Sequence, residues 1–222
     1  MILGADGERL SKRHGATSVM EYSELGILPE ALVNYLARLG WSHGDHEVFT
    51  MDQLRQWFDL EHVHSSPARF DPEKLNWLNQ QYLKRADTAR LVNLVQVHLP
   101  KDRSGPPLER VVDLVKDRAA TVRQLADEAM LFYAKDVPKA AAIPPEARTA
   151  LQALKGKLQK VSWERSALNG AIRETLAASG LKMPQLAMPL RQVLTGRTQT
   201  PSIDAVLELL GRDTVLRRLE EV

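Results

Sequence analysis

The densest group of reactive side chains lies near the start of the chain, in the segment GERLSKRHGATSV, residues 7–19. It places a serine hydroxyl and the adjacent cations Lys12 and Arg13 between two glycines. Backbone amides beside glycines, a hydroxyl and paired cations are groups that bind phosphate, with lysine as a compact charge and arginine as a planar fork. A solvated turn has the same composition, so these residues by themselves leave both interpretations open.

The composition excludes several other chemistries. The 222-residue chain has no cysteine, which excludes disulfides, thiol catalysis and cysteine-ligated zinc, and fits a cytoplasmic protein. No run of about 18 uncharged apolar residues occurs, so we expect no membrane partner. The net charge is only +2, but residues 151–222 carry eleven basic and seven acidic groups, which permits a polyanionic partner.

Two histidines raise the question of a metal. His62 and His64 lie close to Asp59 and Glu61. A two-residue spacing outside a strand is poor geometry for two ligands of one ion. We therefore predict no metal site.

The elements that must position these side chains are mostly helical, because apolar residues recur with helical spacing along almost the whole chain. Leu32, Leu36 and Leu39 form one such face, in a helix that Pro29 begins and Gly40 ends. Short extended pieces are possible at 16–19 and 48–50, but no series of alternating strands occurs. The expected fold class is therefore mainly α.

Several helix ends are specified by local signals. Thr50 with Gln53 and Thr121 with Gln124 have capping-box spacing, and Asp71 precedes a proline. Further helices are expected from Ser162 to a stop at Gly180, from Ser202 to a stop at Gly211, and from Asp213 onward. We interpret four tryptophans as packing residues rather than as stacking platforms for bases: Trp41, Trp57, Trp77 and Trp163.

The opening segment also resembles a known signature. GERLSKRHGATSV is similar to the KMSKS motif of class I aminoacyl-tRNA synthetases, in the form found in bacterial-type glutamyl-tRNA synthetases. Three later blocks resemble the same family in order: YSELGILPEALVNYLARLGWSHGDHEVFT, SSPARFDPEKLNWLNQQYL and MPLRQVLTGRTQTPSIDAVLELLGRDTVLRRLE. The first of these three blocks includes the acidic pair Asp45 and Glu47. Together the blocks cover nearly the whole chain.

The resemblance implies that the chain is a C-terminal piece of such an enzyme. No His-Ile-Gly-His element occurs among the six histidines, and no parallel-strand pattern is present. We therefore expect the catalytic α/β nucleotide-binding domain to be absent. The implied organisation is a loop remnant of the catalytic domain (1–15), a helical stem-contact domain (16–105) and an all-helical, two-part anticodon-binding region (106–155 and 156–222).

The resemblance also implies two groups of site residues. The KMSKS-type loop binds ATP in the family, and its counterparts here are Arg9, Leu10, Ser11, Lys12 and Arg13. Arg9 stands where the first lysine is usual, and Arg13 replaces the final serine. The implied anticodon-binding residues are Arg191, Thr200, Pro201 and Ile203: the first offers donors to a base edge, the second a hydroxyl, and the last two an apolar platform. Plausible phosphate contacts, equally well explained as solvated helix faces, are Arg118, Arg123, Lys155, Lys157 and Lys160.

The implied function is recognition of the tRNA stem corner and anticodon loop within a glutamate–tRNA ligase. The parent enzyme would use ATP with Mg, glutamate and glutamate tRNA, whereas this chain alone is expected to be inactive, to bind no cofactor and to be a monomer. Two other hypotheses remain, a stand-alone helical module that binds RNA or protein and a purely structural domain. Neither explains the retained ATP loop.

Overall fold

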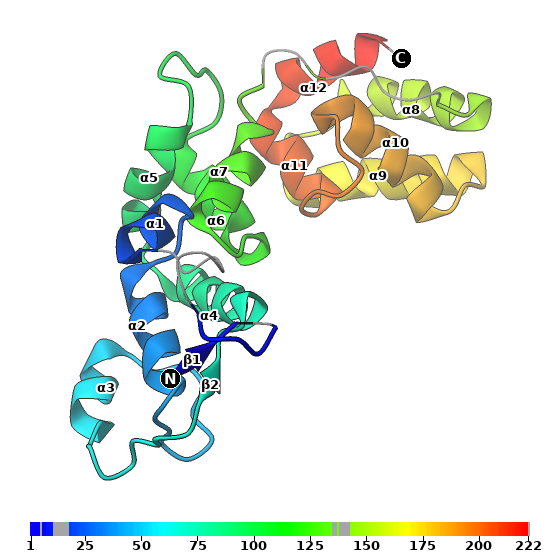
Figure 1. Cartoon of the computed structure of the whole chain (residues 1–222). Coiled ribbons are helices and arrows are strands. Elements are labelled where there is room, and N and C mark those ends of the chain that lie inside the picture. The colour runs from blue at the N-terminus through cyan, green and yellow to red at the C-terminus, as the bar shows by residue number, and fades with distance from the viewer. Residues whose placement is uncertain (5, 11–17, 135–136, 138–142, 222) are drawn as a thin grey trace. The chain divides into compact units, whose positions relative to one another are not determined.

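A computed structural model of the chain describes residues 1–4, 6–10, 18–134, 137 and 143–221 (Figure 1). It is mostly helical, which confirms the predicted fold class. The chain divides into two compact units: Met1–Leu99 with Lys116–Glu128, and Pro100–Val115 with Ala129–Val222. The predicted boundaries at 15/16, 105/106 and 155/156 stay predictions.

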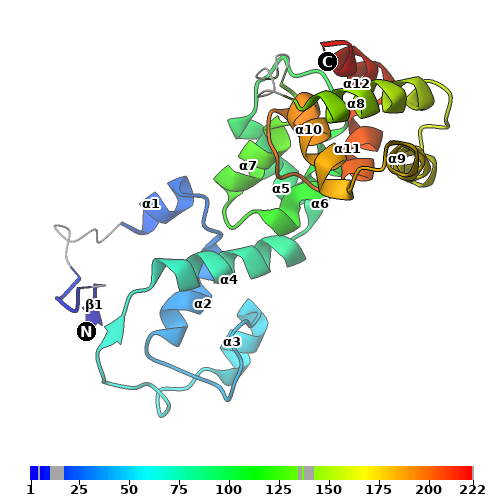
Figure 2. The same ribbon diagram turned by 90° about the vertical axis from the view of Figure 1, so that its right-hand side faces the viewer.

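The first unit is built around two packed helices, α2 (Pro29–Arg38) and α4 (Pro72–Arg85). They lie side by side in both views (Figures 1 and 2). Each buries one apolar face, with Ala31 and Leu32 on α2 and Leu75 and Leu78 on α4. Burial of these faces is the main stabilising contribution to the pair.

Shorter helices complete the unit. They are α1 (Val19–Glu24), α3 (Met51–Trp57), α5 (Thr88–Val95) and most of α7 (Val122–Met130), with 3-10 turns at Gln96–His98 and Lys116–Arg118. The helix starts predicted at Thr50, Asp71 and Thr121 are confirmed by hydrogen bonds. Thr50 and Gln53 form a reciprocal capping box, and the Asp71 carboxylate accepts from two backbone N–H groups of α4. The Gln124 backbone N–H donates to the Thr121 hydroxyl at 3.1 Å.

A buried asparagine ties three parts of this unit together. Asn79 on α4 is fully buried. Its oxygen accepts from the Leu28 N–H at 2.8 Å, and its amide group donates to the carbonyls of Gly26 and Ala120 at 3.1 and 2.6 Å. Gly26 has φ +82°, and a Cβ there would lie 2.8 Å from the backbone nitrogen of Val122. The close approach of these segments therefore requires glycine.

The unit also contains a small sheet that local patterns did not predict. β1 (Ile2–Leu3) pairs in parallel with β2 (Ala68–Arg69), with Ile2 opposite Ala68. Neither expected extended piece forms a strand in the residues that the structure describes: Ser18 and Thr50 have extended backbone, but Val19 begins α1 and 48–50 is unpaired. Residues 16 and 17 lie outside the described part of the chain. Two-residue strands far apart in sequence leave no periodic signal, so only the folded chain reveals their pairing.

All regular secondary structure in the described residues of the second unit is helical. Its helices are α6 (Leu108–Val115), α8 (Pro145–Leu158), α9 (Arg165–Ser179), α10 (Met183–Thr195), α11 (Ile203–Leu210) and α12 (Arg212–Arg218). α9 packs against α8 and α11, and α10 packs against α8 (Figure 2). Gly180 ends α9 at φ +69°, as predicted. The predicted start at Ser162 was wrong, because α9 begins at Arg165 with no side-chain cap.

The packing role of the tryptophans and of α2's leucines is only partly confirmed. Trp41 is 2 % exposed, whereas Trp77 is 40 % exposed, with the Lys74 ammonium 4.2 Å from its ring centroid. Leu36 is also exposed, since α2 buries Asn34 and Tyr35 instead. The apolar sequence pattern therefore predicted wider buried faces on α2 and α4 than the structure has.

Candidate nucleic-acid interface

The predicted residues Arg191 and Thr200 lie together in the second unit. Arg191 is on α10, and its Nε donates to the Thr200 hydroxyl at 3.1 Å. That hydroxyl in turn donates to the Pro201 carbonyl at 2.9 Å. A guanidinium has five N–H donors, so a bond through Nε uses only one of them. The arrangement fixes the guanidinium while retaining its capacity to bind a further acceptor.

The turn that brings these two residues together has its own hydrogen bonds. Gly196 ends α10 in the left-handed region, at φ +73°. The Thr195 hydroxyl donates to the Arg191 carbonyl at 2.8 Å and accepts from the Arg197 backbone N–H at 3.2 Å. This cap reverses the chain immediately after α10, so that Thr200 returns to the side chain of Arg191.

The far end of the same turn is held by an ion pair. On α9, Arg165 donates to the Asp204 carboxylate at 2.9 Å and to the Ser202 hydroxyl at 3.1 Å. Burial acts to raise the pKa of Asp204, but the Arg165 guanidinium and the Ser202 hydroxyl outweigh it and hold the pKa below its ordinary value. Asp204 therefore stays ionised and fixes the start of α11.

The remaining two predicted anticodon residues are buried. Ile203 is 7 % exposed, and Pro201 is also buried, as is the Thr200 side chain. In this conformation neither apolar side chain presents an open face to a base, so the expected platform role is not supported by their burial. Their assignment to the anticodon site stays a prediction, and Arg191 is the member of the set that is not buried.

The predicted ATP loop is described only at its beginning. Leu3 and Arg9 form an antiparallel bridge, and the Leu10 N–H donates to the Ile2 carbonyl at 2.9 Å. The Gly4 N–H closes the turn by donating to the Glu8 carbonyl at 2.8 Å. Arg9 is exposed. Ser11, Lys12 and Arg13 lie outside the described residues.

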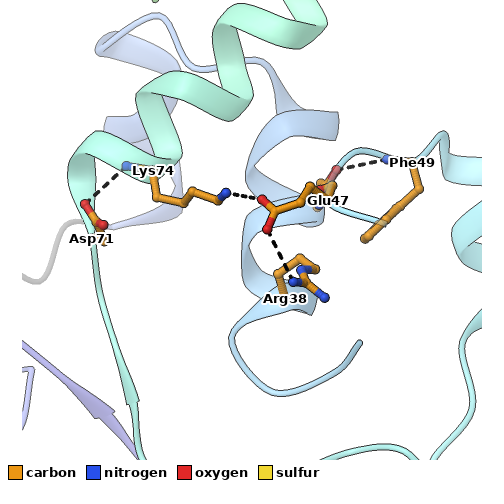
Figure 3. Close-up of polar contacts among 6 residues, drawn as sticks. Arg38, Glu47, Phe49, Asp71 and Lys74 are labelled. Carbon is orange, nitrogen blue, oxygen red and sulfur yellow. Dashed lines mark hydrogen bonds and ion pairs between the residues drawn. The ribbon is translucent and has the colours of Figure 1, made fainter. Parts of the chain in front are cut away.

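The first unit has a polar cluster that sequence reasoning did not identify (Figure 3). Glu47 pairs with Lys74 on α4 and lies 3.6 Å from the Arg38 guanidinium. Its hydrogen bond with Lys74 lowers the pKa of Glu47 despite partial burial. The buried Asn34 amide donates to the Glu47 carbonyl at 3.1 Å and accepts from the Phe49 N–H at 3.2 Å. The cluster is a structural anchor for the segment before α3.

A tyrosine completes that anchor. The Tyr82 hydroxyl donates to the Phe49 carbonyl at 2.5 Å and lies 2.8 Å from the Asn34 side-chain oxygen. Burial raises the pKa of Tyr82 to about 12. The neutral phenol is therefore retained through the whole physiological range. Its position on α4, 33 residues from Phe49, explains why no local pattern could find it.

Most of the candidate phosphate contacts have partners within the chain. Arg118 lies 3.2 Å from Glu128, Lys157 2.6 Å from Glu174 and Lys155 3.6 Å from Glu220. Arg123 donates to the Glu24 carbonyl. Lys160 is exposed. Four of the five side chains thus have a structural role that does not depend on RNA.

The described residues contain no cluster of three or more metal-ligand side chains. His62 instead lies 2.7 Å from the Asp59 carboxylate, and its backbone N–H donates to the same group at 2.8 Å. This contact closes a turn.

No helix in the described ranges has the length and apolar character needed to cross a membrane.

Comparison with known proteins places these features in a family. The family model described as "Anticodon binding domain" matches residues 68–222, and a second, "tRNA synthetases class I (E and Q), catalytic domain", matches residues 1–77. The chain belongs to the anticodon-binding domain family. Both the helical second unit and the Arg191 turn fall within the range matched by that model.

Curated relatives narrow the assignment. The chain is 54% identical over 99% of its length to the glutamate–tRNA ligase of Nitrosospira multiformis, covering 50% of that protein. It is 56% identical over 99% of its length to the corresponding ligase of Thiobacillus denitrificans, covering 48% of it. The chain thus spans about half the length of the curated relatives it matches.

Solved structures match the chain to the same family as the curated relatives do. A glutamate tRNA ligase from Elizabethkingia meningosepticum, crystallised in complex with its amino acid, superposes with a TM-score of 0.86 at 28% identity, over 100% of this chain and 49% of that one. The corresponding synthetase from Elizabethkingia anophelis gives a TM-score of 0.78 at 27% identity, over 100% of this chain and 49% of that one. These matches confirm the resemblance on which the sequence interpretation rested, and they favour it over a stand-alone module.

Proposed function

We propose that this chain is the tRNA-binding part of a glutamate–tRNA ligase, an ATP-dependent enzyme that joins glutamate to its tRNA. The observation that carries the proposal is the match to the anticodon-binding domain over residues 68–222, within a chain whose curated relatives are glutamate–tRNA ligases. In this proposal, the second unit reads unpaired bases of the anticodon loop, as single-stranded RNA is generally read. The parent enzyme acts in the cytoplasm as a monomer.

Arg191 is the residue we expect to read a base edge. Its Nε bond to Thr200 fixes the plane of the guanidinium, and a fixed fork loses less conformational entropy when it binds an acceptor. Thr200, Pro201 and Ile203 then contribute by holding this geometry from within the core. Their burial supports a positioning role.

Arg9, Leu10, Ser11, Lys12 and Arg13 are proposed to contact ATP, with Mg, when the nucleotide-binding part of the parent enzyme is present. The match of residues 1–77 to the class I catalytic domain supports this role. Cations at this position stabilise charge that develops on the phosphates as pyrophosphate leaves. The chain alone is proposed to be inactive, because it spans only about half the length of the ligases it matches.

Binding of an anticodon stem–loop RNA of glutamate tRNA tests the proposal. The affinity should fall steeply as salt rises, since phosphate contacts release counterions. Arg191→Ala should weaken binding of the cognate loop about tenfold and binding of loops with altered bases much less. Arg173→Ala removes an exposed cation from α9 and serves as the matched control.

A salt-independent affinity would contradict the proposed RNA contact. Equal losses for cognate and altered loops in Arg191→Ala would reduce Arg191 to a contact with the RNA backbone.

A further inference from the structure

The small sheet of the first unit brings two arginines to one of its faces. β1 is paired on one side with β2, so that Leu3 lies opposite Arg69 (Figure 1). On its other side, Leu3 forms the antiparallel bridge with Arg9. Residues that lie opposite one another in paired strands point to the same face of the sheet. Arg9 and Arg69 therefore flank Leu3 on one face.

Backbone hydrogen bonds fix the register of this sheet. The Ala68 N–H donates to the Met1 carbonyl at 3.0 Å, and the Phe70 N–H donates to the Leu3 carbonyl at 2.8 Å. The Phe70 ring is held in turn by the buried Tyr35, with 5.3 Å between the ring centroids. The strand that carries the second arginine therefore has a fixed place beside the segment that leads into the predicted ATP loop.

The Arg69 guanidinium lies on the side of that loop. Its Nη2 atom is 3.9 Å from the position that a Cβ on Gly7 would occupy. Gly7 has φ +83° and belongs to the turn between β1 and Arg9. Arg69 therefore reaches the beginning of the loop from a strand that is distant in the sequence.

Neither arginine is neutralised within the part of the chain that the structure describes. Both are exposed, and no ion pair or hydrogen bond there involves either guanidinium. Asp6, in the same turn, accepts instead from the Glu8 backbone N–H at 3.0 Å. Neighbouring strands lie about 4.8 Å apart, which places the backbones of Arg9 and Arg69 about 10 Å apart. Two long cationic side chains that start at this spacing on one face can bind the same polyphosphate.

We propose that Arg69 is a phosphate-binding residue of the ATP site, acting together with Arg9 on the triphosphate of the nucleotide. The inference rests on the proposed function, in which the loop contacts ATP. The planar guanidinium fork matches the oxygens of a phosphate and can bind them through two N–H groups at once. The family resemblance assigns Arg9 to the loop but gives Arg69 no role.

Two exposed arginines could also contact the phosphates of an RNA backbone. ATP is favoured because one of the two arginines belongs to the predicted ATP loop and the other lies against the turn that leads into it. The range 1–77, matched by the class I catalytic-domain model, is also the one that contains both residues. The two ligands are distinguished by which Michaelis constant changes when Arg69 is replaced.

Steady-state kinetics of the parent ligase that contains this chain test the proposal. In Arg69→Gln, KM for ATP should rise about tenfold, as the loss of a charge-assisted hydrogen-bonding group predicts. The value of kcat should change little, because the contact is made in the bound substrate as well as in the transition state. KM for tRNA should not change. The inhibition constant of inorganic pyrophosphate should rise with KM for ATP, and it does not depend on turnover of ATP.

Two further variants separate a phosphate contact from a structural effect. Arg69→Lys keeps the charge but not the fork, and it should recover part of the lost affinity for ATP. Arg55→Gln removes an exposed arginine from α3 in the same unit and is the matched control, expected to retain the wild-type KM for ATP. The unfolding free energy of the 222-residue chain should be the same in Arg69→Gln as in wild type, because the side chain is exposed.

The possible outcomes separate this inference from the proposed function. An unchanged KM for ATP in Arg69→Gln would overturn the role of Arg69 and leave the proposed function intact. A rise in KM for tRNA alone would assign the arginine to the RNA backbone, and a lower kcat with a lower unfolding free energy would assign it to the fold; either result overturns the inference. A wild-type ligase that does not attach glutamate to tRNA would overturn both proposals.

Discussion

The two units fix their irregular segments with different side chains. In the first unit, the buried amides of Asn34 and Asn79 bond to backbone groups on either side of a turn. In the second unit, the same task falls to the guanidinium groups of Arg165, Arg191 and Arg218. An amide both donates and accepts, whereas a guanidinium only donates.

This difference bears on function. A neutral amide that is fully bonded to backbone contributes rigidity that neither pH nor salt alters, and it has no remaining capacity for a ligand. An arginine that holds a carbonyl or hydroxyl with one N–H keeps its charge and other donors. Of the three arginines, only Arg191 meets this condition, because Arg165 is paired with Asp204 and Arg218 is buried. Arg191 is therefore the one of the three suited to contact a polyanion.

The strongest test of the comparison removes an amide. Asn79→Ala should destabilise the first unit by about 3 kcal/mol, since it leaves the Leu28 N–H and the Ala120 carbonyl without the partner they have in the fold. The Gly26 carbonyl loses one of two bonds and keeps the Val122 N–H at 2.9 Å. Urea unfolding followed by hydrogen exchange measures the loss in each unit. The exposed Asn93→Ala is the control. A loss of unfolding free energy no larger than that of the control would mean that the Asn79 amide is not a structural anchor.

Removing a buried guanidinium should have a smaller effect. Arg218 is 7 % exposed and donates to the carbonyls of Leu194, near the end of α10, and of Ala134, the latter at 2.7 Å. Arg218→Met keeps the apolar stem and should cost the second unit about 2 kcal/mol in unfolding free energy. Arg217→Met, at the adjacent exposed position, should change it little. Equal effects of the two variants would contradict the anchoring role.

The smallest expected effect is on the dependence of stability on acidic pH. Asp204 and Glu47 both have a pKa below the ordinary value, so each adds stability above its unfolded pKa and loses it as pH falls through the lower folded pKa. Asp204 is 14% exposed and Glu47 40%. Asp204→Asn should therefore remove about 1 kcal/mol at neutral pH, and Glu47→Gln less.

Both acid-test variants should also flatten the loss of stability as pH falls toward 3. Unfolding free energies measured in urea as a function of pH check this expectation. A steeper acid dependence in Asp204→Asn than in wild type would refute the assigned role of the ion pair.

Helix limits were predictable wherever a single side chain decides them. Thr50, Asp71 and Gly180 act within one turn of the backbone, so their effect is present in the local sequence. Apart from the helix start expected at Ser162, the failures share one cause: the partner residue is distant in the sequence. The pairing of Ile2 with Ala68 has no local sequence pattern. The same holds on α2, where Asn34 is buried and Leu36 is exposed.

The candidate site shows the same division. The family resemblance identified Arg191 and Thr200, which the fold brings to 3.1 Å. It gave no indication of Arg165, because the contacts of Arg165 with Asp204 and Ser202 depend on how α9 packs against α11. Pro201 and Ile203, which the resemblance assigns to an apolar platform, are buried in this structure, as apolar side chains that can leave water are. Their role at the anticodon site stays a prediction.

The sequence by itself determined that this chain is helical, where many of its helices begin and end, and which family it resembles. Only the tertiary structure decided which of several similar side chains are buried and bonded within the fold. Arg217 and Arg218 are adjacent and chemically identical, yet one is exposed and the other buried against two carbonyls. The reason is physical: helix caps depend on neighbours in the chain, whereas burial depends on the faces that distant helices present to one another.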